Sequence, residues 1–328
     1  MKRVGIGGQA VLEGIMMKGP DRYSLAVRKE DGEIALEVHD YKSFSERKHL
    51  DRIPLVRGVV NFVESLYIGM KTLMASSEYF MEEEEEESSE KAGESAEKAA
   101  QEGKKEEKKE DTKEEKEGKG YLVVALLISL AFAIGVFILL PSFLANLLYK
   151  VTDSHILVNT CEGLLRLLIF LGYIILISQM KDIKRTFMYH GAEHKAINCL
   201  EAGNELTPEN VLKATRFHRR CGTSFVFIVM IISILMFMFI RTDTVWLRFL
   251  SRLLLIPVVA GLSYEVIRYA GRHNNACSRI MSAPGLWVQR ITTREPDYSM
   301  AEVAIKAVDA VIDWREYVEC VRNDSFEK

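Results

Sequence analysis

Four long apolar segments in the second half of the chain most restrict how it can fold. They cover residues 121–148, about 156–179, 224–240 and 246–270. A helix needs about 20 apolar residues to cross the hydrocarbon core of a bilayer, so the third segment is at the short end of that range. We therefore predict a mainly α fold, an integral membrane four-helix bundle over residues 121–270.

The Lys and Arg residues around these segments predict their orientation. The short loops 147–155 and 241–245 hold one basic residue each, whereas the connection 180–223 holds eight. Because positively charged loops stay on the cytoplasmic side, we expect loop 180–223 and both termini in the cytoplasm. The expected location is the cell membrane, with several passes.

The segment before the membrane domain combines a small β unit with one helix. Alternating runs at 23–28 and 34–39 flank Asp31-Gly32, a typical hairpin turn, so we expect a β unit over residues 5–42. Residues 56–80 carry apolar side chains interrupted by charged ones. We expect them to form an amphipathic helix on the membrane or on the protein rather than a spanning helix, which completes a cytoplasmic unit over residues 1–80.

Two further segments are expected outside the membrane. Residues 82–120 contain seventeen acidic residues and nine lysines without apolar periodicity, which predicts a charged disordered linker. In 271–328 we expect a polar, turn-rich stretch around Pro284-Gly285. An amphipathic helix should follow, opened by a capping box at Ser299 and Glu302 and ending near Val318.

Cysteine content and charge exclude some classes of function. Five cysteines without a C-x-x-C spacing argue against a disulfide framework and for a reducing compartment. The basic residues follow the membrane orientation and no aromatic-basic surface motif occurs, so we expect no nucleic-acid partner.

The motif with the clearest chemistry is His190-Gly191-Ala192-Glu193-His194, an H-x-x-E-H sequence. On a helix His190 and His194 lie one turn apart on one face, where both imidazoles can reach a single metal ion. In this inverted zincin spacing the glutamate is not a ligand but accepts a proton from the attacking water. The competing interpretation is a polar helix next to the membrane with interfacial histidines.

The predicted topology brings further candidates to the same cytoplasmic surface. Glu265 lies near the cytoplasmic end of the fourth segment, and a carboxylate in such a helix marks a functional site unless Arg268 alone neutralises it. We predict Glu265 as the third metal ligand. Additional ligands or substrate contacts are expected among His218, Arg219, Arg220 and Cys221, which precede the third segment, and Gln9 and Glu13 in the glycine-rich N-terminal motif. The N-terminal pair can contribute only if the helix at 56–80 does not span.

Five motifs together resemble the YqhQ-like family of bacterial and plastid membrane proteins. They are residues 7–14 (GGQAVLEG), 189–195 (YHGAEHK), 218–225 (HRRCGTSF), 263–265 (SYE), and 284–287 (PGLW) with 292–296 (TTREP). The resemblance covers nearly the whole chain except the linker. It implies a domain of unknown function described as a predicted metal-dependent enzyme, and it brings no substrate.

From the sequence we expect a membrane-embedded, metal-dependent hydrolase. Its metal would be zinc, with iron or manganese as alternatives, and its substrate a membrane-associated peptide, lipid head group or lipid-linked intermediate. The alternative is a non-enzymatic assembly or regulatory factor, or a small-solute or metal transporter. Four spans are few for a transporter unless it forms a homo-oligomer.

Overall fold

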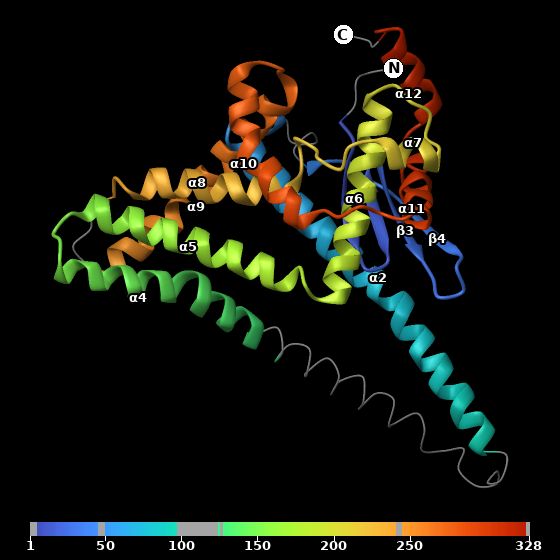
Figure 1. The fold of residues 1–328 in the computed structure, drawn as a ribbon, viewed down its shortest axis with the longest axis horizontal. Coiled ribbons are helices and arrows are strands. Elements are labelled where there is room, and N and C mark those ends of the chain that lie inside the picture. Colours follow the sequence, from blue (N-terminus) through green and yellow to red (C-terminus); the bar gives the residue numbers. More distant parts are fainter. Residues whose placement is uncertain (1–4, 45–49, 97–123, 125–126, 241–244, 326–328) are drawn as a thin grey trace. The chain divides into compact units, whose positions relative to one another are not determined.

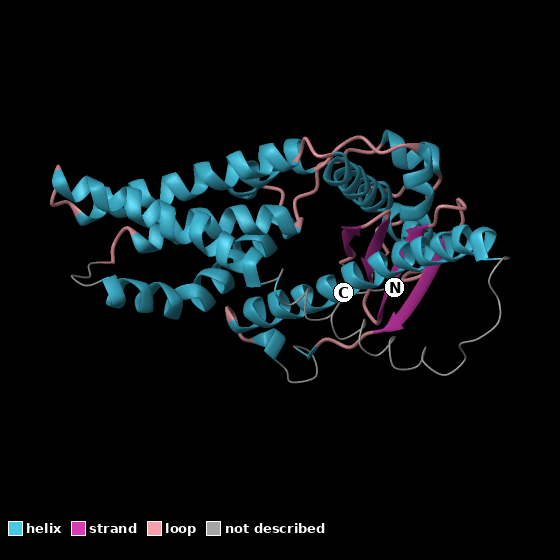
Figure 2. Cartoon of the chain, turned by 90° about the horizontal axis from the view of Figure 1, so that it is seen from below, coloured by secondary structure: helices cyan, strands magenta, loops and turns pink. Residues whose placement is uncertain are grey.

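The protein is mainly helical and carries one small antiparallel sheet near its N-terminus (Figure 2). The computed structural model describes residues 5–44, 50–96, 124, 127–240 and 245–325. The chain divides into two compact units, residues 1–80 with 172–328, and residues 81–171. The first unit contains the sheet and all candidate site residues.

The sheet consists of four antiparallel strands in the order β1-β2-β3-β4, each paired with the next along the chain. The strands are β1 (Gly7–Val11), β2 (Gly14–Lys18), β3 (Arg22–Arg28) and β4 (Ile34–Asp40). Gly32 adopts a positive φ in the β3–β4 turn, as the Asp-Gly signal predicts. The first hairpin turns at Glu13, also at positive φ, and was not predicted.

Helices cover both faces of this sheet. Alternate residues of β2 point to opposite faces. Ile15 and Met17 join a core with α6 (Lys181–Glu201) and α11 (Tyr298–Asp309). Met16 on the other face packs with Ile68 of α2 (Val56–Ala96). Figure 1 shows α6 and α11 beside the strands.

In the described part of the chain, three helical stretches are long and apolar enough to cross a membrane: Leu127–Lys150, His155–Ile177 and Leu250–Arg272. The first comprises η2 (Gly135–Leu139), α4 (Leu140–Asn146) and η3 (Leu147–Lys150); the second is α5 (His155–Ile177); the third lies in α9 (Val245–Arg272). The remaining predicted span corresponds to α8 (Gly222–Phe237), a shorter apolar helix. Within α5, Arg166 forms an i,i+4 ion pair with Glu162 at 3.0 Å.

The second half of the chain differs from the prediction at its C-terminal end. The stretch expected to be turn-rich is a helix, α10 (Ala276–Thr292), which contains Pro284 and begins with a capping box between Asn275 and Ser278. Gly285 within it lies against Ser224 of α8, where a Cβ atom would be 2.5 Å from the serine side chain. The Pro-Gly pair therefore permits close helix packing rather than a turn.

The expected C-terminal helix is two helices. Asp297, not Ser299, caps α11 and accepts a hydrogen bond from Met300 N–H at 2.9 Å. Helix α11 ends at Asp309. Asp313 is the N-cap of α12 (Trp314–Arg322). The two remaining short elements are η1 (Leu50–Arg52) and α7 (Pro208–Lys213).

Helix α2 continues beyond the predicted cytoplasmic unit. It reaches Ala96, so residues 82–96 of the predicted charged linker are helical. Residues 97–120 of that linker lie outside the described part of the chain.

Candidate functional site

The H-x-x-E-H motif lies on α6, as its spacing predicts, at the level where this helix crosses β1. Its members are largely buried, with Glu193 4% and His194 1% exposed. Gly191 faces the segment after α10, where any side chain would collide with the carbonyl of Arg294. Arg294 N–H donates to the carbonyl of Phe187 at 2.8 Å, which ties this segment to α6.

Backbone carbonyls orient both histidines. Nδ1 of His190 lies 2.8 Å from the carbonyl oxygen of Thr292, and Nδ1 of His194 lies 2.6 Å from that of Arg216. A carbonyl only accepts, so each Nδ1 carries a proton. In the neutral ring the lone pair is then on Nε2. The two motif histidines thus present Nε2 with a fixed ring orientation, the arrangement common among metal-bound histidines.

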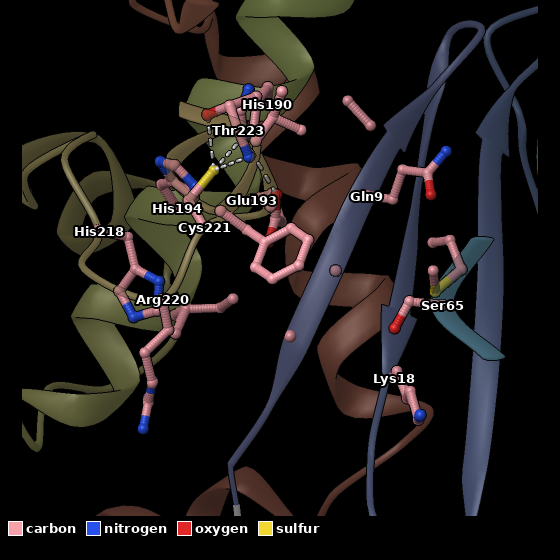
Figure 3. A pocket seen from close by; sticks show the side chains of 18 of the residues that line it. Gln9, Lys18, Ser65, His190, Glu193, His194, His218, Arg220, Cys221 and Thr223 are labelled. Atoms are coloured by element: carbon pink, nitrogen blue, oxygen red, sulfur yellow. Dashed lines mark hydrogen bonds and ion pairs between the residues drawn. The ribbon is translucent and has the colours of Figure 1, made fainter. Parts of the chain in front are cut away.

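Cys221 lies close to both histidines. Its Sγ lies 3.2 Å from Nε2 of His190, and ligand atoms of His190, His194 and Cys221 all lie within 4.8 Å of one another. We refer to these three residues as the HHC cluster. In Figure 3, dashed lines join the sulfur to His190 and to Thr223.

The surroundings of Cys221 favour a thiolate. The residue is the N-cap of α8, and Thr223 N–H donates to its sulfur at 3.4 Å. Burial raises the pKa of the Cys221 thiol, but the charges of His190 and His194 and their hydrogen bonds bring it well below its usual range. Burial opposes charge on His190, and the neighbouring Cys221 outweighs this effect and raises the pKa of His190 to about 9.

A buried glutamine fixes the loop that carries Cys221. Gln289 of α10 accepts from His218 N–H at 2.8 Å and donates to the His218 carbonyl at 2.7 Å and to Ser224 Oγ at 2.8 Å. Its side chain is fully buried. Gln289 therefore holds both ends of the loop 218–224 and positions Cys221.

Glu193 lies beside the HHC cluster without belonging to it. One carboxylate oxygen is 3.9 Å from Nε2 of His190. The side chain packs directly against β1, where a Cβ atom at Gly8 would be 2.9 Å from Cγ of Glu193. A glycine at position 8 therefore gives this carboxylate its room.

A cavity of about 560 Å³ opens in front of these groups. Its walls come from β1, β2, α2, α6, the loop before α8, α8 itself and α9. Apolar side chains dominate the lining, and Glu193, the HHC cluster, Lys18 and Arg220 provide polar groups. This is within the size range of sites for small ligands or short chain segments.

The structure places Glu265 elsewhere. Its carboxylate accepts two hydrogen bonds from Arg57 of α2, at 2.6 Å from Nε and 2.5 Å from Nη2. It is therefore not among the residues whose ligand atoms surround the Cys221 sulfur. The third member of the cluster is Cys221, which the sequence analysis had included only among the additional candidates, and the partner of Glu265 is Arg57 rather than Arg268.

The neighbours of Cys221 in sequence point to other partners. Nε2 of His218 lies 3.6 Å from a carboxylate oxygen of Glu201, and burial lowers the pKa of His218. Arg220 also pairs with Glu201, and Arg219 contacts Asn274 at 3.4 Å. His218 and Arg220 line the cavity, but they are not part of the HHC cluster.

The two N-terminal candidates have structural contacts. Gln9 donates to the carbonyl of Gly69 at 3.4 Å and lines the cavity on the side of α2. Glu13 pairs with Arg185 and accepts from the Tyr189 hydroxyl at 3.2 Å. Glu13 thus connects the first hairpin to α6, and it neither lines the cavity nor belongs to the HHC cluster.

Sequence comparison agrees with the motifs above. Residues 53–314 match the family described as "Protein of unknown function (DUF1385)". The chain belongs to this family. It is 36% identical over 313 residues to the "Uncharacterized protein YqhQ" of Bacillus subtilis (strain 168), covering 93% of this chain and 92% of that protein. No solved structure matches the chain.

Proposed function

We propose that the protein is a membrane-bound, zinc-dependent hydrolase in which His190, His194 and Cys221 hold the metal and Glu193 is the general base. The observation that carries this proposal is the shared orientation of the two histidines. Each donates Nδ1–H to a carbonyl, Nε2 of His190 lies 3.2 Å from the Cys221 sulfur, and His194 has a ring nitrogen within 4.8 Å of both. Three protein ligands and an open fourth position are typical of catalytic zinc.

The choice of metal is narrower with Cys221, rather than Glu265, as the third ligand. A thiolate with two imidazoles suits zinc, whereas manganese prefers oxygen ligands. Zinc bound there would polarise a substrate carbonyl and make a water molecule more acidic. Glu193 is close enough to accept a proton from such a water molecule while remaining outside the ligand set.

We further propose a multi-pass protein of the cell membrane with four membrane helices packed as a bundle and both termini in the cytoplasm. The basic loop between α5 and α8 supports this orientation. Helix α8 would complete the bundle. The amphipathic C-terminal helices and the cavity would then face the cytoplasmic surface, where a membrane-associated substrate is accessible.

Metal content of purified protein tests this proposal. We expect about one zinc per chain in the wild type by inductively coupled plasma mass spectrometry, and loss of zinc in His190→Ala, His194→Ala and Cys221→Ala. Glu265→Ala is the matched control and should retain zinc. Absence of metal from every preparation, even after reconstitution with zinc, iron or manganese, would favour an assembly or regulatory factor instead.

Glu193→Gln separates an enzyme from a metal-binding protein. If the protein is an enzyme, the Glu193→Gln variant keeps zinc and fails to support the cellular function. If it supports that function fully while His190→Ala does not, hydrolysis is wrong and a binding or transport role remains.

The 3.2 Å contact between Cys221 and His190 favours a second candidate, a hydrolase with Cys221 as nucleophile. A thiolate at a helix N-terminus beside an imidazole is the usual form of an activated cysteine. In that case Cys221→Ser abolishes activity, and removing zinc does not.

A further inference from the structure

The strand next to Glu193 has a free edge. β1 is the first strand of the sheet, and among the described residues it pairs on one side only, with β2. Gly7, Gly8, Gln9 and Ala10 all line the cavity. The close-up view shows Gln9 on the opposite side of the strands from Glu193 and the HHC cluster (Figure 3). Because residues from both faces of β1 reach the cavity, the cavity runs along the outer edge of this strand.

The hydrogen-bond pattern identifies which residues of β1 face outward. Arg28 N–H donates to the carbonyl of Glu13 and Gly19 N–H donates to that of Arg22, both at 2.9 Å. Glu13 and Gly19 are six residues apart, and every second residue of a strand bonds to the same neighbour, so Ile15 and Met17 between them also bond to β3. The intervening residues of β2 then bond to β1.

It follows that Gly8 and Ala10 direct their N–H and C=O groups away from the sheet. Gln9 pairs with Met16 and therefore bonds inward, so its two neighbours bond outward. Within the described part of the chain, no hydrogen bond to another element uses the outer groups of Gly8 or Ala10. Gly8 is also the residue of β1 against which the Glu193 side chain packs. A free row of backbone groups thus begins beside the proposed general base.

The rest of the cavity suits apolar side chains. Phe62 and Leu66 of α2 line one wall, and Phe225 and Val226 of α8 line another. A ligand that pairs with the outward N–H and C=O groups of β1 needs alternating donors and acceptors at the spacing of a strand. It also needs apolar groups to contact these walls. An acyl chain offers the apolar groups without the donors, whereas an extended peptide offers both.

We propose that the substrate is an extended, apolar peptide segment that pairs with Gly8 and Ala10 as a fifth strand on the free edge of β1. This inference rests on the proposed hydrolase function. Hydrolysis would break the peptide C–N bond and form a C–O bond to water. Glu193 would take one proton from the water and pass it to the nitrogen of the leaving amine.

Peptide binding without cleavage tests the inference. The protein is the full-length Glu193→Gln variant, zinc-loaded and in lipid nanodiscs, so that no detergent fills the cavity. The probe is a fluorescent peptide with a core of alternating Leu and Val between serine-rich flanks, and binding is followed by anisotropy. Ala10→Pro removes one outward N–H, a change that edge strands tolerate.

The opposite edge of the sheet offers a matched control. Tyr41 N–H donates to the carbonyl of Asp21 at 2.8 Å, which places the N–H of Val38 on the outer side of β4. Val38 is 45% exposed and does not line the cavity. Val38→Pro therefore makes the same chemical change on the edge away from Glu193.

We expect Ala10→Pro to weaken binding roughly tenfold, the loss of about one hydrogen bond, and Val38→Pro to bind like the parent. N-methylation of the peptide should weaken binding at alternate positions only. This second measurement uses the parent protein and stays decisive if Ala10→Pro misfolds. Equal binding by both proline variants when both are folded, or an N-methylation profile without alternation, would refute the inference.

Two further outcomes separate this inference from the proposed function. If a fluorescent fatty acid binds to the protein and the peptide does not, the cavity is an acyl-chain site and the peptide substrate is refuted. Strand-like peptide binding by a wild-type protein that cleaves nothing would keep the peptide site and refute the hydrolase.

Discussion

The sulfur of Cys221 lies 3.2 Å from Nε2 of His190, although the two residues are separated by 31 positions in the chain. A metal ion between them would replace this contact and cover the thiolate. We therefore predict that zinc protects Cys221 from alkylation by iodoacetamide, and that a chelator increases its labelling by roughly tenfold or more. Mass spectrometry of the digested protein measures this directly.

Cys277 is the internal control for this experiment, because it is exposed and remote from the HHC cluster. Its labelling should be the same with and without the chelator. Equal labelling of Cys221 in both conditions would mean that this thiol is not a zinc ligand.

A second prediction concerns Gln289, which binds both backbone groups of His218 and the hydroxyl of Ser224. Gln289→Met keeps the volume of the side chain and removes all three hydrogen bonds. We expect zinc affinity to fall by about 10–100-fold, as for other residues that support metal ligands. Competition with a chromophoric chelator measures the affinity.

Gln179→Met is the comparison for this change, because it replaces an exposed glutamine outside the cavity. It should bind zinc like the wild type. Unchanged zinc affinity in a folded Gln289→Met variant would show that the loop 218–224 holds its shape without this glutamine.

The sequence alone could predict features that depend on residues close together in the chain. The spacing of His190 and His194 suffices to place both on one helix face, and Asp31-Gly32 suffices for the hairpin turn. Both are local patterns that the backbone geometry decides within a few residues. The pair of Glu162 and Arg166 belongs to the same class.

Features that depend on contacts distant in sequence were not accessible in this way. The choice of Arg57 over Arg268 as the partner of Glu265 follows from the packing of α2 against α9, where Gly58 and Gly261 allow a close approach. Pro284-Gly285 is a local turn signal, but both residues lie inside α10. Gly285 there allows close packing of α10 against Ser224 of α8. A buried Gln in an apolar stretch was the available sign of the role of Gln289.

The ion pair of Glu265 and Arg57 leads to a third prediction. The two side chains are 27% and 18% exposed, so removing one leaves the other partly buried without this partner. Glu265→Met should retain zinc and lower the free energy of unfolding by about 1–3 kcal/mol, less than for a fully buried pair. The double variant Arg57→Met/Glu265→Met should recover part of that loss, as measured by thermal unfolding in detergent. Loss of zinc on Glu265→Met in folded protein would restore Glu265 as a ligand candidate.

The last prediction tests the contact between Gly8 and Glu193. A methyl group at position 8 would lie 2.7 Å from the carbonyl oxygen of Met16 and 2.9 Å from Cγ of Glu193. The contact with the Met16 carbonyl requires a small shift of the β1–β2 ladder, and the contact with Cγ pushes on the Glu193 side chain. We therefore expect Gly8→Ala to displace the Glu193 carboxylate and leave the zinc ligands in place. Activity in cells should fall strongly while zinc content stays near the wild-type value.

The neighbouring Gly7 provides the control, because a Cβ atom there meets nothing within 4 Å. Gly7→Ala makes the same chemical change one residue earlier on the same strand, and it should keep both zinc and activity. If Gly8→Ala and Gly7→Ala are equally active, the position of the Glu193 carboxylate against β1 does not matter for function, and Glu193 is not the general base. If both lose activity and zinc, the strand itself is sensitive to substitution, and the close contact at Gly8 does not explain the loss.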